Sequence, residues 1–101
     1  MPFFWNIENT KLAKEWDKGK YKDVTTGDII LIGRIIQNKK MKGYNYGSFI
    51  LEKEDIPYLE KWLLENAEDK EDKKEAKRLV EIAGMLIGAK FGRIHKIRIG
   101  D

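Results

Sequence analysis

The pattern of hydrophobic and polar positions changes its period near residue 55. Before that point, the longest apolar run is the β-branched segment from Ile29 to Gln37, which predicts a strand. After it, apolar residues recur at intervals of three and four. This spacing predicts two amphipathic helices, one beginning at Asp55 and one from Lys74 to Ile87. The chain therefore combines strand-type and helix-type segments.

Shorter segments fill the first part of the chain. Pro2 to Ile7 is short and aromatic, which is typical of a strand. Thr10 is suited to cap a short helix that Gly19 would end. Thr25 to Asp28 has the composition of a turn leading into the apolar run.

The remaining segments complete the predicted order of elements. Asn38 to Gly43 predicts a basic turn, and Tyr44 to Leu51 a strand that pairs back as a hairpin. Arg93 to Ile99 predicts a closing strand. The order is then β-α-β-β-α-α-β in one domain spanning residues 1–101. The predicted fold class is α+β, with an antiparallel sheet of about four strands and two or three helices. Apart from the added helix, this is a ferredoxin-like arrangement.

One feature of the run from Ile29 to Gln37 conflicts with a sheet that is open on one face. In a strand, Ile30 and Ile32 share a side with Arg34, so both faces of the strand are apolar. A continuous apolar run is typical of a strand covered on both faces. Either the helix from Lys74 to Ile87 folds over the sheet, or a second copy of the chain does.

Composition narrows the classes of function. The 101 residues include no cysteine and one histidine, His95, which excludes disulfides, thiolate metal sites and histidine pairs. We therefore expect no metal, no cofactor and no catalysis. The start of the chain lacks a secretory pattern, and no apolar run approaches the roughly 20 residues of a membrane span. A cytoplasmic protein with no membrane partner is expected. The many Lys, Glu and Ile residues are typical of a thermophile.

The placement of charge indicates a polyanion as partner. The chain carries 20 basic and 17 acidic residues, a formal net charge of +3. Acidic residues concentrate between Glu52 and Glu81, leaving two basic clusters outside that region. The clusters consist of Lys39, Lys40 and Lys42, and of Lys90, Arg93, Lys96 and Arg98. Such an uneven field orients a polyanion on one face.

The segment KGYNYGSF, from Lys42 to Phe49, is the most informative stretch. Strand alternation places Tyr44 and Tyr46 on one face and Phe49 on the other, where Phe49 would join the core. Two aromatic side chains in register form a platform for stacked bases, and neighbouring lysines hold phosphates. The alternative is a cross-strand aromatic pair that stabilises a hairpin.

This segment resembles the octamer of the RNA-recognition motif family. Matching positions are Lys42, Gly43, Tyr44, Tyr46 and Phe49, whereas Asn45 and Gly47 depart from the pattern. PFFWNI is similar to the family's hexamer on the first strand, and GRIHKIRIG to its closing strand. The resemblance implies that Phe3, Tyr44 and Tyr46 stack on bases and that Lys42 contacts phosphate.

The predicted function is binding of single-stranded DNA or RNA by stacking and phosphate contacts. The residues predicted to take part are Phe3, Trp5, Arg34, Lys39, Lys40, Lys42, Tyr44, Tyr46, Lys96 and Arg98.

Two observations leave other partners open. The segment from Tyr46 to Leu63 resembles the strand-to-helix junction of positive-cofactor-type transcriptional coactivators, which bind single-stranded DNA as dimers. A homodimer is therefore possible. The apolar face of the helix from Lys74 to Ile87 supports the alternative function, a protein-interaction or oligomerisation module that inhibits or scaffolds a partner.

Overall fold

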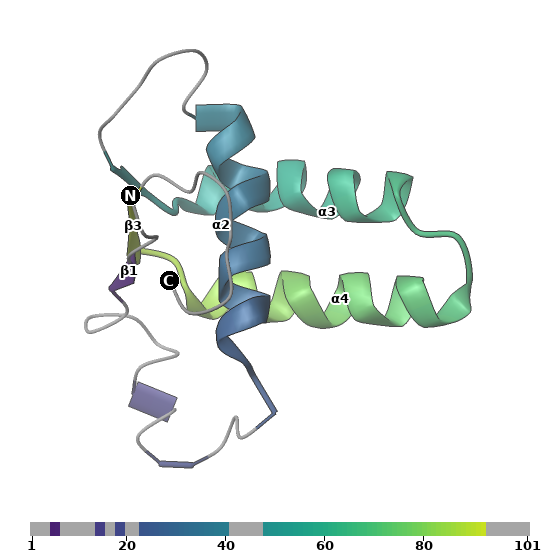
Figure 1. Cartoon of the computed structure of the whole chain (residues 1–101), viewed down its shortest axis with the longest axis horizontal. Helices are drawn as coiled ribbons and strands as arrows, with labels where there is room; N and C mark the ends of the chain where they lie inside the picture. The colour runs from purple at the N-terminus through teal and green to yellow at the C-terminus, as the bar shows by residue number, and fades with distance from the viewer. Residues whose placement is uncertain (1–4, 7–13, 16–17, 20–22, 41–47, 93–101) are drawn as a thin grey trace.

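The structure is a computed structural model that describes residues 5–6, 14–15, 18–19, 23–40 and 48–92. In chain order its elements are β1 (Trp5–Asn6), α2 (Thr26–Lys40), β2 (Phe49–Ile50), the 3-10 turn η1 (Lys53–Asp55), α3 (Ile56–Glu65), α4 (Lys70–Met85) and β3 (Lys90–Phe91). Helices α3 and α4 form an antiparallel hairpin, and α2 crosses one end of it (Figure 1). The small sheet lies beside that same end, so the rest of the hairpin projects away from it.

The predicted four-stranded α+β fold is wrong, because its central strand is a helix. Residues 29–37 belong to α2, which buries Ile29, Ile32, Ile35 and Ile36. β-branched residues lower helix propensity by only tenths of a kcal/mol each. Burying an isoleucine side chain contributes about 1.5–3 kcal/mol, so packing decides the conformation.

A helix also removes the conflict of a strand that is apolar on both faces. Leu31, Arg34 and Asn38 are exposed and lie three and four residues apart, which is one stripe of a helix. Gly33, between them in sequence, is buried with the isoleucines. The apolar run from Ile29 to Gln37 therefore has the period of an amphipathic helix and not that of a strand.

The predicted turn from Thr25 to Asp28 is the N-terminal cap of α2. The Thr25 Oγ1 accepts a hydrogen bond from the Asp28 backbone N–H at 3.2 Å, and the Thr25 N–H donates to Asp28 Oδ2 at 3.0 Å. This reciprocal pair is a capping box, which satisfies two backbone donors that a helix start leaves without partners. The signal T-x-x-D directly before an apolar run was present in the sequence.

Helices α3 and α4 confirm the prediction of two amphipathic helices after residue 55. Pro57 occupies the first turn of α3, where its missing N–H costs nothing. Helix α4 begins four residues before the predicted Lys74, because the Asp69 side chain caps it by accepting from the Asp72 N–H at 2.8 Å. After α4, Gly88 adopts a φ of 96°, a left-handed conformation that glycine tolerates, and the chain turns into β3.

The sheet is much smaller than predicted. Its strand order is β1-β3-β2, both pairings are antiparallel, and each strand has two residues. Phe49 pairs with Phe91 across β2 and β3, and their rings stack with centroids 5.3 Å apart. Both side chains are buried, so the prediction that Phe49 joins the core is confirmed.

The remaining predicted elements lie only partly within the described residues. Lys14 and Glu15 are helical, as expected of the helix after Thr10. Trp5–Asn6 lies within the predicted first strand, whereas residues 41–47 and 93–101 are outside the described part of the chain. No helix that the structure describes has the length and apolar character needed to cross a membrane.

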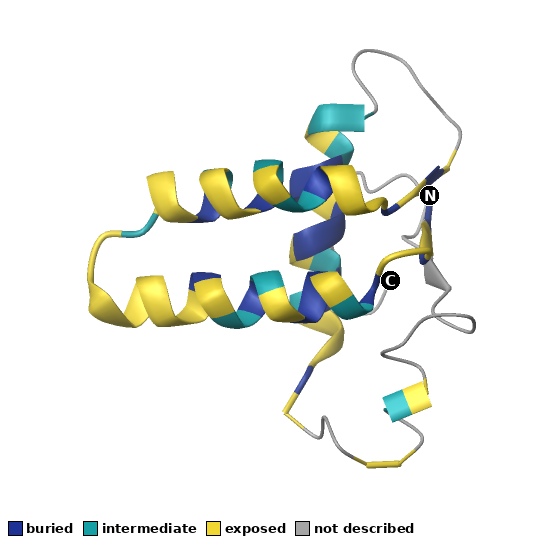
Figure 2. Cartoon of the chain, turned by 180° about the vertical axis from the view of Figure 1, so that it is seen from behind, coloured by how far each residue is buried: buried dark blue, intermediate teal, exposed yellow. Residues whose placement is uncertain are grey.

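The core lies where α2 crosses the base of the hairpin. Buried residues, dark blue in Figure 2, concentrate there, and exposed residues increase toward the α3–α4 connection. Ile32 and Ile36 of α2, Leu59 of α3 and Ala83 of α4 are fully buried together with Leu86. The three helices therefore depend on one shared core at one end of the hairpin.

The helical assignment of residues 29–37 predicts a pattern of stability losses. Ile32→Ala and Ile35→Ala should each lower the free energy of unfolding by about 2–5 kcal/mol, because both side chains are buried. Leu31→Ala should cost less than about 1 kcal/mol, because Leu31 is 37 % exposed. Urea unfolding followed by far-UV circular dichroism measures all three. A strand with one buried face would spare either Ile32 or Ile35, since they point to opposite sides of a strand.

Candidate functional site

The structure describes four of the ten residues that were predicted to form one nucleic-acid site. Arg34 is exposed on α2, and Lys39 and Lys40 form the last turn of that helix instead of a basic turn. Trp5 lies in β1, next to the central strand β3. The other members lie outside the described residues: Phe3, Lys42, Tyr44, Tyr46, Lys96 and Arg98.

Lys39 and Lys40 bind a buried carboxylate within the chain. The Asp55 side chain is 1 % exposed, and its oxygens accept hydrogen bonds from Lys39 Nζ and Lys40 Nζ, each at 2.8 Å. The Glu52 backbone N–H donates to Asp55 Oδ2 at 2.8 Å. Lys40 Nζ also donates to Glu52 Oε1 and to the Ile50 carbonyl, both at 2.6 Å. These ion pairs and hydrogen bonds connect the C-terminal end of α2 to the segment that joins β2 to α3.

The electrostatics of this cluster agree with a structural role. Burial would raise the pKa of Asp55, but hydrogen bonds from Lys39 and Lys40 outweigh it, so the pKa of Asp55 is lowered. Burial would lower the pKa of Lys40, yet its hydrogen bonds to Asp55 and Glu52 raise the pKa overall. Both groups therefore stay charged at neutral pH, and Lys40 is held in place by protein oxygens. Lys39 and Lys40 thus have ion-pair partners within the chain, and their role in nucleic-acid binding stays a prediction.

A second charged cluster connects α4 to the start of α2. Arg78 donates to Asp28 Oδ2 at 2.9 Å, to the Asp23 carbonyl at 2.8 Å and to Glu75 Oε1 at 2.8 Å. The hydrogen bond with Asp28 is the main cause that raises the pKa of Arg78. Burial would raise the pKa of Asp28, but its hydrogen bonds with Arg78 and Thr25 lower it. The carboxylate of Asp28 thus both caps α2 and accepts a hydrogen bond from Arg78.

The projecting part of the hairpin carries the candidate binding site, a groove between α3 and α4. Its volume is about 460 Å³. Three apolar and four charged residues line it, and we call the apolar set its floor and the charged set its rims. The floor consists of Leu64, Ala76 and Val80, and the rims of Glu60, Lys73, Lys77 and Glu81. We call this site the hairpin groove. Leu64 is 48 % exposed there and lines the groove together with Val80.

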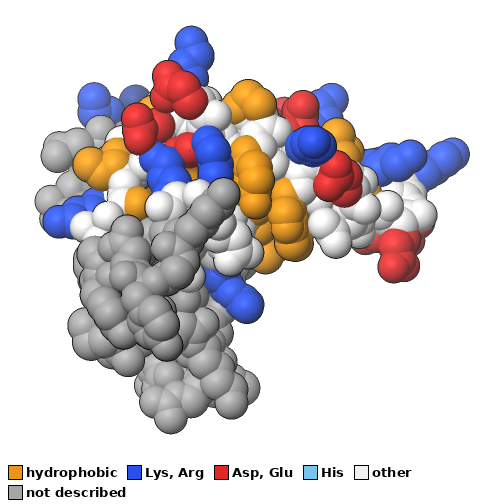
Figure 3. All heavy atoms as spheres, turned by 90° about the horizontal axis from the view of Figure 1, so that it is seen from above, with side chains coloured by type: hydrophobic (Ala, Val, Ile, Leu, Met, Phe, Trp, Pro, Cys, Tyr) orange, Lys and Arg blue, Asp and Glu red, His pale blue; other side chains and the backbone are white. Residues whose placement is uncertain are grey.

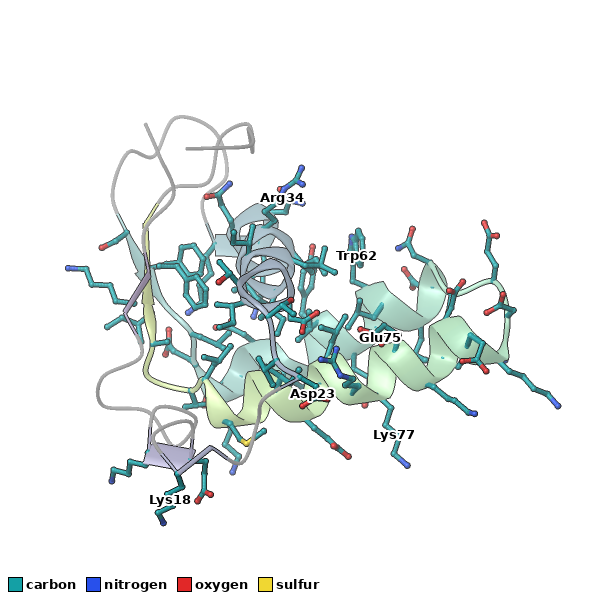
Figure 4. All side chains as sticks on the ribbon, turned by 60° about the horizontal axis from the view of Figure 1, so that its bottom comes forward. Lys18, Asp23, Arg34, Trp62, Glu75 and Lys77 are labelled. Atoms are coloured by element: carbon teal, nitrogen blue, oxygen red, sulfur yellow. The ribbon has the colours of Figure 1, made fainter. Side chains whose placement is uncertain are left out.

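A smaller hollow of about 210 Å³ lies on the other side of the hairpin, beside Leu31 and Trp62. Figure 4 shows Trp62 and Lys77 pointing to opposite sides of the α3–α4 pair. Trp62 is half-buried and packs against the edge of the core. In the view from above, hydrophobic side chains gather in a band at the middle of the face, with charged side chains at both ends (Figure 3).

The sequence did not reveal the hairpin groove, although it contained a signal for it. In sequence, Leu64 comes directly after a residue of the apolar face of α3. It therefore lies outside the apolar stripe of α3 that packs into the core. Most of the α4 face predicted as an interface is instead used within the chain, since Ala76, Leu79 and Ala83 are buried. Val80, which is half-buried, and Ala76 leave part of that face in the groove.

Comparison of the chain with protein-family models, with curated proteins and with solved structures found no match in any of the three. Within the described residues, no group of three or more His, Cys, Asp or Glu side chains is arranged to hold a metal ion. Any proposal about function therefore depends on the geometry of the chain itself.

The Asp55 cluster predicts both a stability loss and a pH dependence. Asp55→Asn should lower the free energy of unfolding by about 3 kcal/mol, because it breaks a buried ion pair. This value is at the lower end of the range for such pairs, since Lys39 is 35 % exposed and water partly screens its charge. The matched control, Glu54→Gln, changes an exposed neighbour and should cost less than about 0.5 kcal/mol.

The sign of the pH effect follows from the lowered pKa of Asp55. Its contribution is complete above the unfolded value of about 3.9 and is lost as the pH falls through the folded value. Stability of the wild-type chain should therefore decline more steeply than that of Asp55→Asn below about pH 4. Urea titrations from about pH 2.5 to 7 measure this difference, and equal slopes would contradict the assignment.

Proposed function

We propose that this chain is a protein-interaction module whose binding element is the projecting α3–α4 hairpin. The observation that carries the proposal is the hairpin groove, which is lined by Leu64 and Val80 together with four charged residues and by no residue of α2. An apolar floor with a polar rim is the usual anatomy of a protein–protein interface. The core at the base of the hairpin holds the two helices in place, so the groove is formed before a partner binds.

The rim charges support a protein partner. Within the described part of the chain, Glu60, Lys73 and Lys77 belong to no salt bridge, whereas Lys61 and Lys74 on the same helices pair with Glu65 and Glu71. Charges without partners beside an apolar floor give an interface its specificity and orientation. The cysteine-free chain suits a reducing compartment, and we propose a cytoplasmic location.

Site-specific photo-crosslinking tests this function. A benzophenone amino acid at position 81, on the rim, should form adducts with a protein partner in an extract of the source cells. The same group at position 54, which is exposed on η1 outside the groove, should not. Adding Leu64→Lys should reduce adduct formation about tenfold, because it places a charge on the apolar floor.

The partner found by mass spectrometry is then purified and titrated against both chains by calorimetry. Leu64→Lys should weaken the measured affinity about tenfold and leave unfolding by urea nearly unchanged. Adducts that are as frequent at position 54 as at position 81 would refute the proposal.

A second candidate, binding of single-stranded nucleic acid, is favoured by one observation. Arg34 is exposed and makes no salt bridge within the described residues, and its side chain points to the same side of the molecule as Trp62 (Figure 4). A guanidinium and a half-exposed indole on the same side of the molecule are suited to one phosphate and one stacked base. Tyr44 and Tyr46 lie outside the described residues, and their role in stacking remains a prediction.

Titration with fluorescent oligo-dT, oligo-U and a duplex tests the second candidate. Single strands should bind more tightly than duplex, and Arg34→Gln should reduce the salt slope by about 0.7, the loss of one phosphate contact. Replacing Tyr44 and Tyr46 with Ala should cost about 1–3 kcal/mol per lost stack. Lys40→Gln is the control, because Lys40 is held by Asp55 and should affect stability and not the slope. Tighter binding to duplex would count against stacking.

A further inference from the structure

We propose that the hairpin groove binds an amphipathic helix of a partner protein, whose acidic half lies over the outer end of the groove and whose basic half lies over its inner end. The outer end is next to the α3–α4 connection, and the inner end faces the core (Figure 1). This inference rests on the proposed function of the groove and names the class of partner. It starts from the order of the charged residues along the groove.

The charge of the groove changes sign along its length. On α4, which runs from the outer end toward the core, Lys73 and Lys77 come first and Glu81 comes last. Lys73 is three residues, or about 4.5 Å, from the start of α4, and Glu60 is five residues, or about 7.5 Å, from the end of α3. Because α4 begins farther out than α3 ends, Glu60 lies nearer to the core than Lys73 does (Figure 1). The outer end of the groove is therefore basic and the inner end acidic.

A glycine continues the α4 side of the groove toward the core. Gly84 lies four residues after Val80 and seven after Lys77, so the three residues share one stripe of the helix. Gly84 is exposed, and a Cβ atom added to it would meet no atom within 4 Å in the described part of the chain. Glycine destabilises a helix relative to alanine, and packing among the described residues does not require it here. Bare backbone at this position lets a second helix approach α4 closely.

The length and the floor of the groove suit a helix. Lys73 and Gly84 are 11 residues apart, about 16.5 Å along α4, which a partner helix of three turns or so covers. Two packed helices accept a third in the groove between them, and its side chains at intervals of three and four form the apolar stripe that enters. The small side chain of Ala76 leaves room on the floor for a large apolar side chain. Leu64, which is 48 % exposed, and Val80 would contact that side chain.

The four rim charges favour a partner whose own charges are segregated. Each rim residue is exposed, and none belongs to a salt bridge within the described residues. A helix that carries one sign of charge would be repelled at one end of the groove, whereas a helix with one acidic and one basic half meets opposite charge at both ends. Acidic residues in the first half and basic residues in the second also agree with the dipole of the helix.

Two synthetic peptides test the order of charge. Both have about 14 residues and a leucine stripe at intervals of three and four. The segregated peptide has glutamates in its first half and lysines in its second half, and the basic peptide has lysines in both. Fluorescence anisotropy at about 0.15 M salt should show that the wild-type chain binds the segregated peptide at least about fivefold more tightly.

A change of charge in the groove should reverse this preference. Lys73→Glu combined with Lys77→Glu makes both ends of the groove acidic, so this variant should bind the basic peptide more tightly than the segregated one. The ratio of the two affinities is compared between chains, which cancels any difference in how helical the free peptides are. Lys18→Glu combined with Lys53→Glu is the control, because it makes the same change of charge at exposed positions outside the groove. It should leave the preference nearly unchanged.

Substitution of Gly84 tests where the helix lies. The φ angle of Gly84 is not positive and the space around its Cα is open, so Gly84→Ala and Gly84→Gln should both raise the midpoint of urea unfolding. Gly84→Ala should weaken binding of the segregated peptide about threefold, and Gly84→Gln at least about tenfold, because the added atoms occupy the space of the helix. A purely structural role of Gly84 would move stability and binding in the same direction.

The outcomes separate this inference from the function on which it rests. A reversed preference together with graded losses at Gly84 would support the inference. It would be overturned by a segregated peptide that does not bind up to about 1 mM, by a preference that does not reverse, or by Gly84→Gln that binds like the wild-type chain. Chains that pair through the groove in sedimentation equilibrium and bind neither peptide would also overturn it. Circular dichroism of each variant confirms that it is folded.

Photo-crosslinking at position 81 then decides about the function itself. If the peptide experiments fail and crosslinking still finds a protein partner, the proposed function survives and the class of partner is wrong. If crosslinking fails as well, both proposals fail.

Discussion

The burial of one isoleucine face on α2 determines how the other elements are placed. Ile29, Ile32 and Ile36 have no exposed surface, and they lie where the two helices of the hairpin meet α2. Burying each contributes about 1.5–3 kcal/mol, which exceeds the effect of any one charged contact at the surface. Because α2 covers only the base of the hairpin, the hairpin keeps an uncovered outer half. The candidate site is a consequence of that limited coverage.

The charged clusters orient α2 across this core without driving its burial. Asp55 receives both lysines at the end of α2, and Asp28 receives Arg78 at its start. A buried carboxylate loses its hydration, and three hydrogen bonds at 2.8 Å offset that loss. Contacts of this kind are short and directional, so they select one orientation of α2 among those that the apolar face would accept. Each end of the helix has its own contact to a different part of the chain.

The sequence allowed the two helices of the hairpin to be predicted but not the helix that crosses them. The apolar residues of α3 and α4 recur with a clear helical period, and Pro57 and Gly88 mark a start and an end. In α2 the residues are β-branched, and both a helix and a strand with two buried faces fit a nearly continuous apolar run. The capping box of Thr25 and Asp28 would have favoured the helix.

The same misassignment explains why the candidate site differs from the predicted one. A strand at residues 29–37 makes residues 38–43 a turn, where lysines face solvent and a polyanion. In a helix, Lys39 and Lys40 instead reach the carboxylate of Asp55, which lies 16 and 15 residues later in the chain. The local pattern of residues does not reveal a contact over that sequence distance. Lys40 is therefore paired with Glu52 and Asp55 of the same chain instead of lying open to a ligand. What remains at the hairpin is a mixture of both signs beside exposed apolar residues, and such a surface is better matched by another protein than by a uniform polyanion.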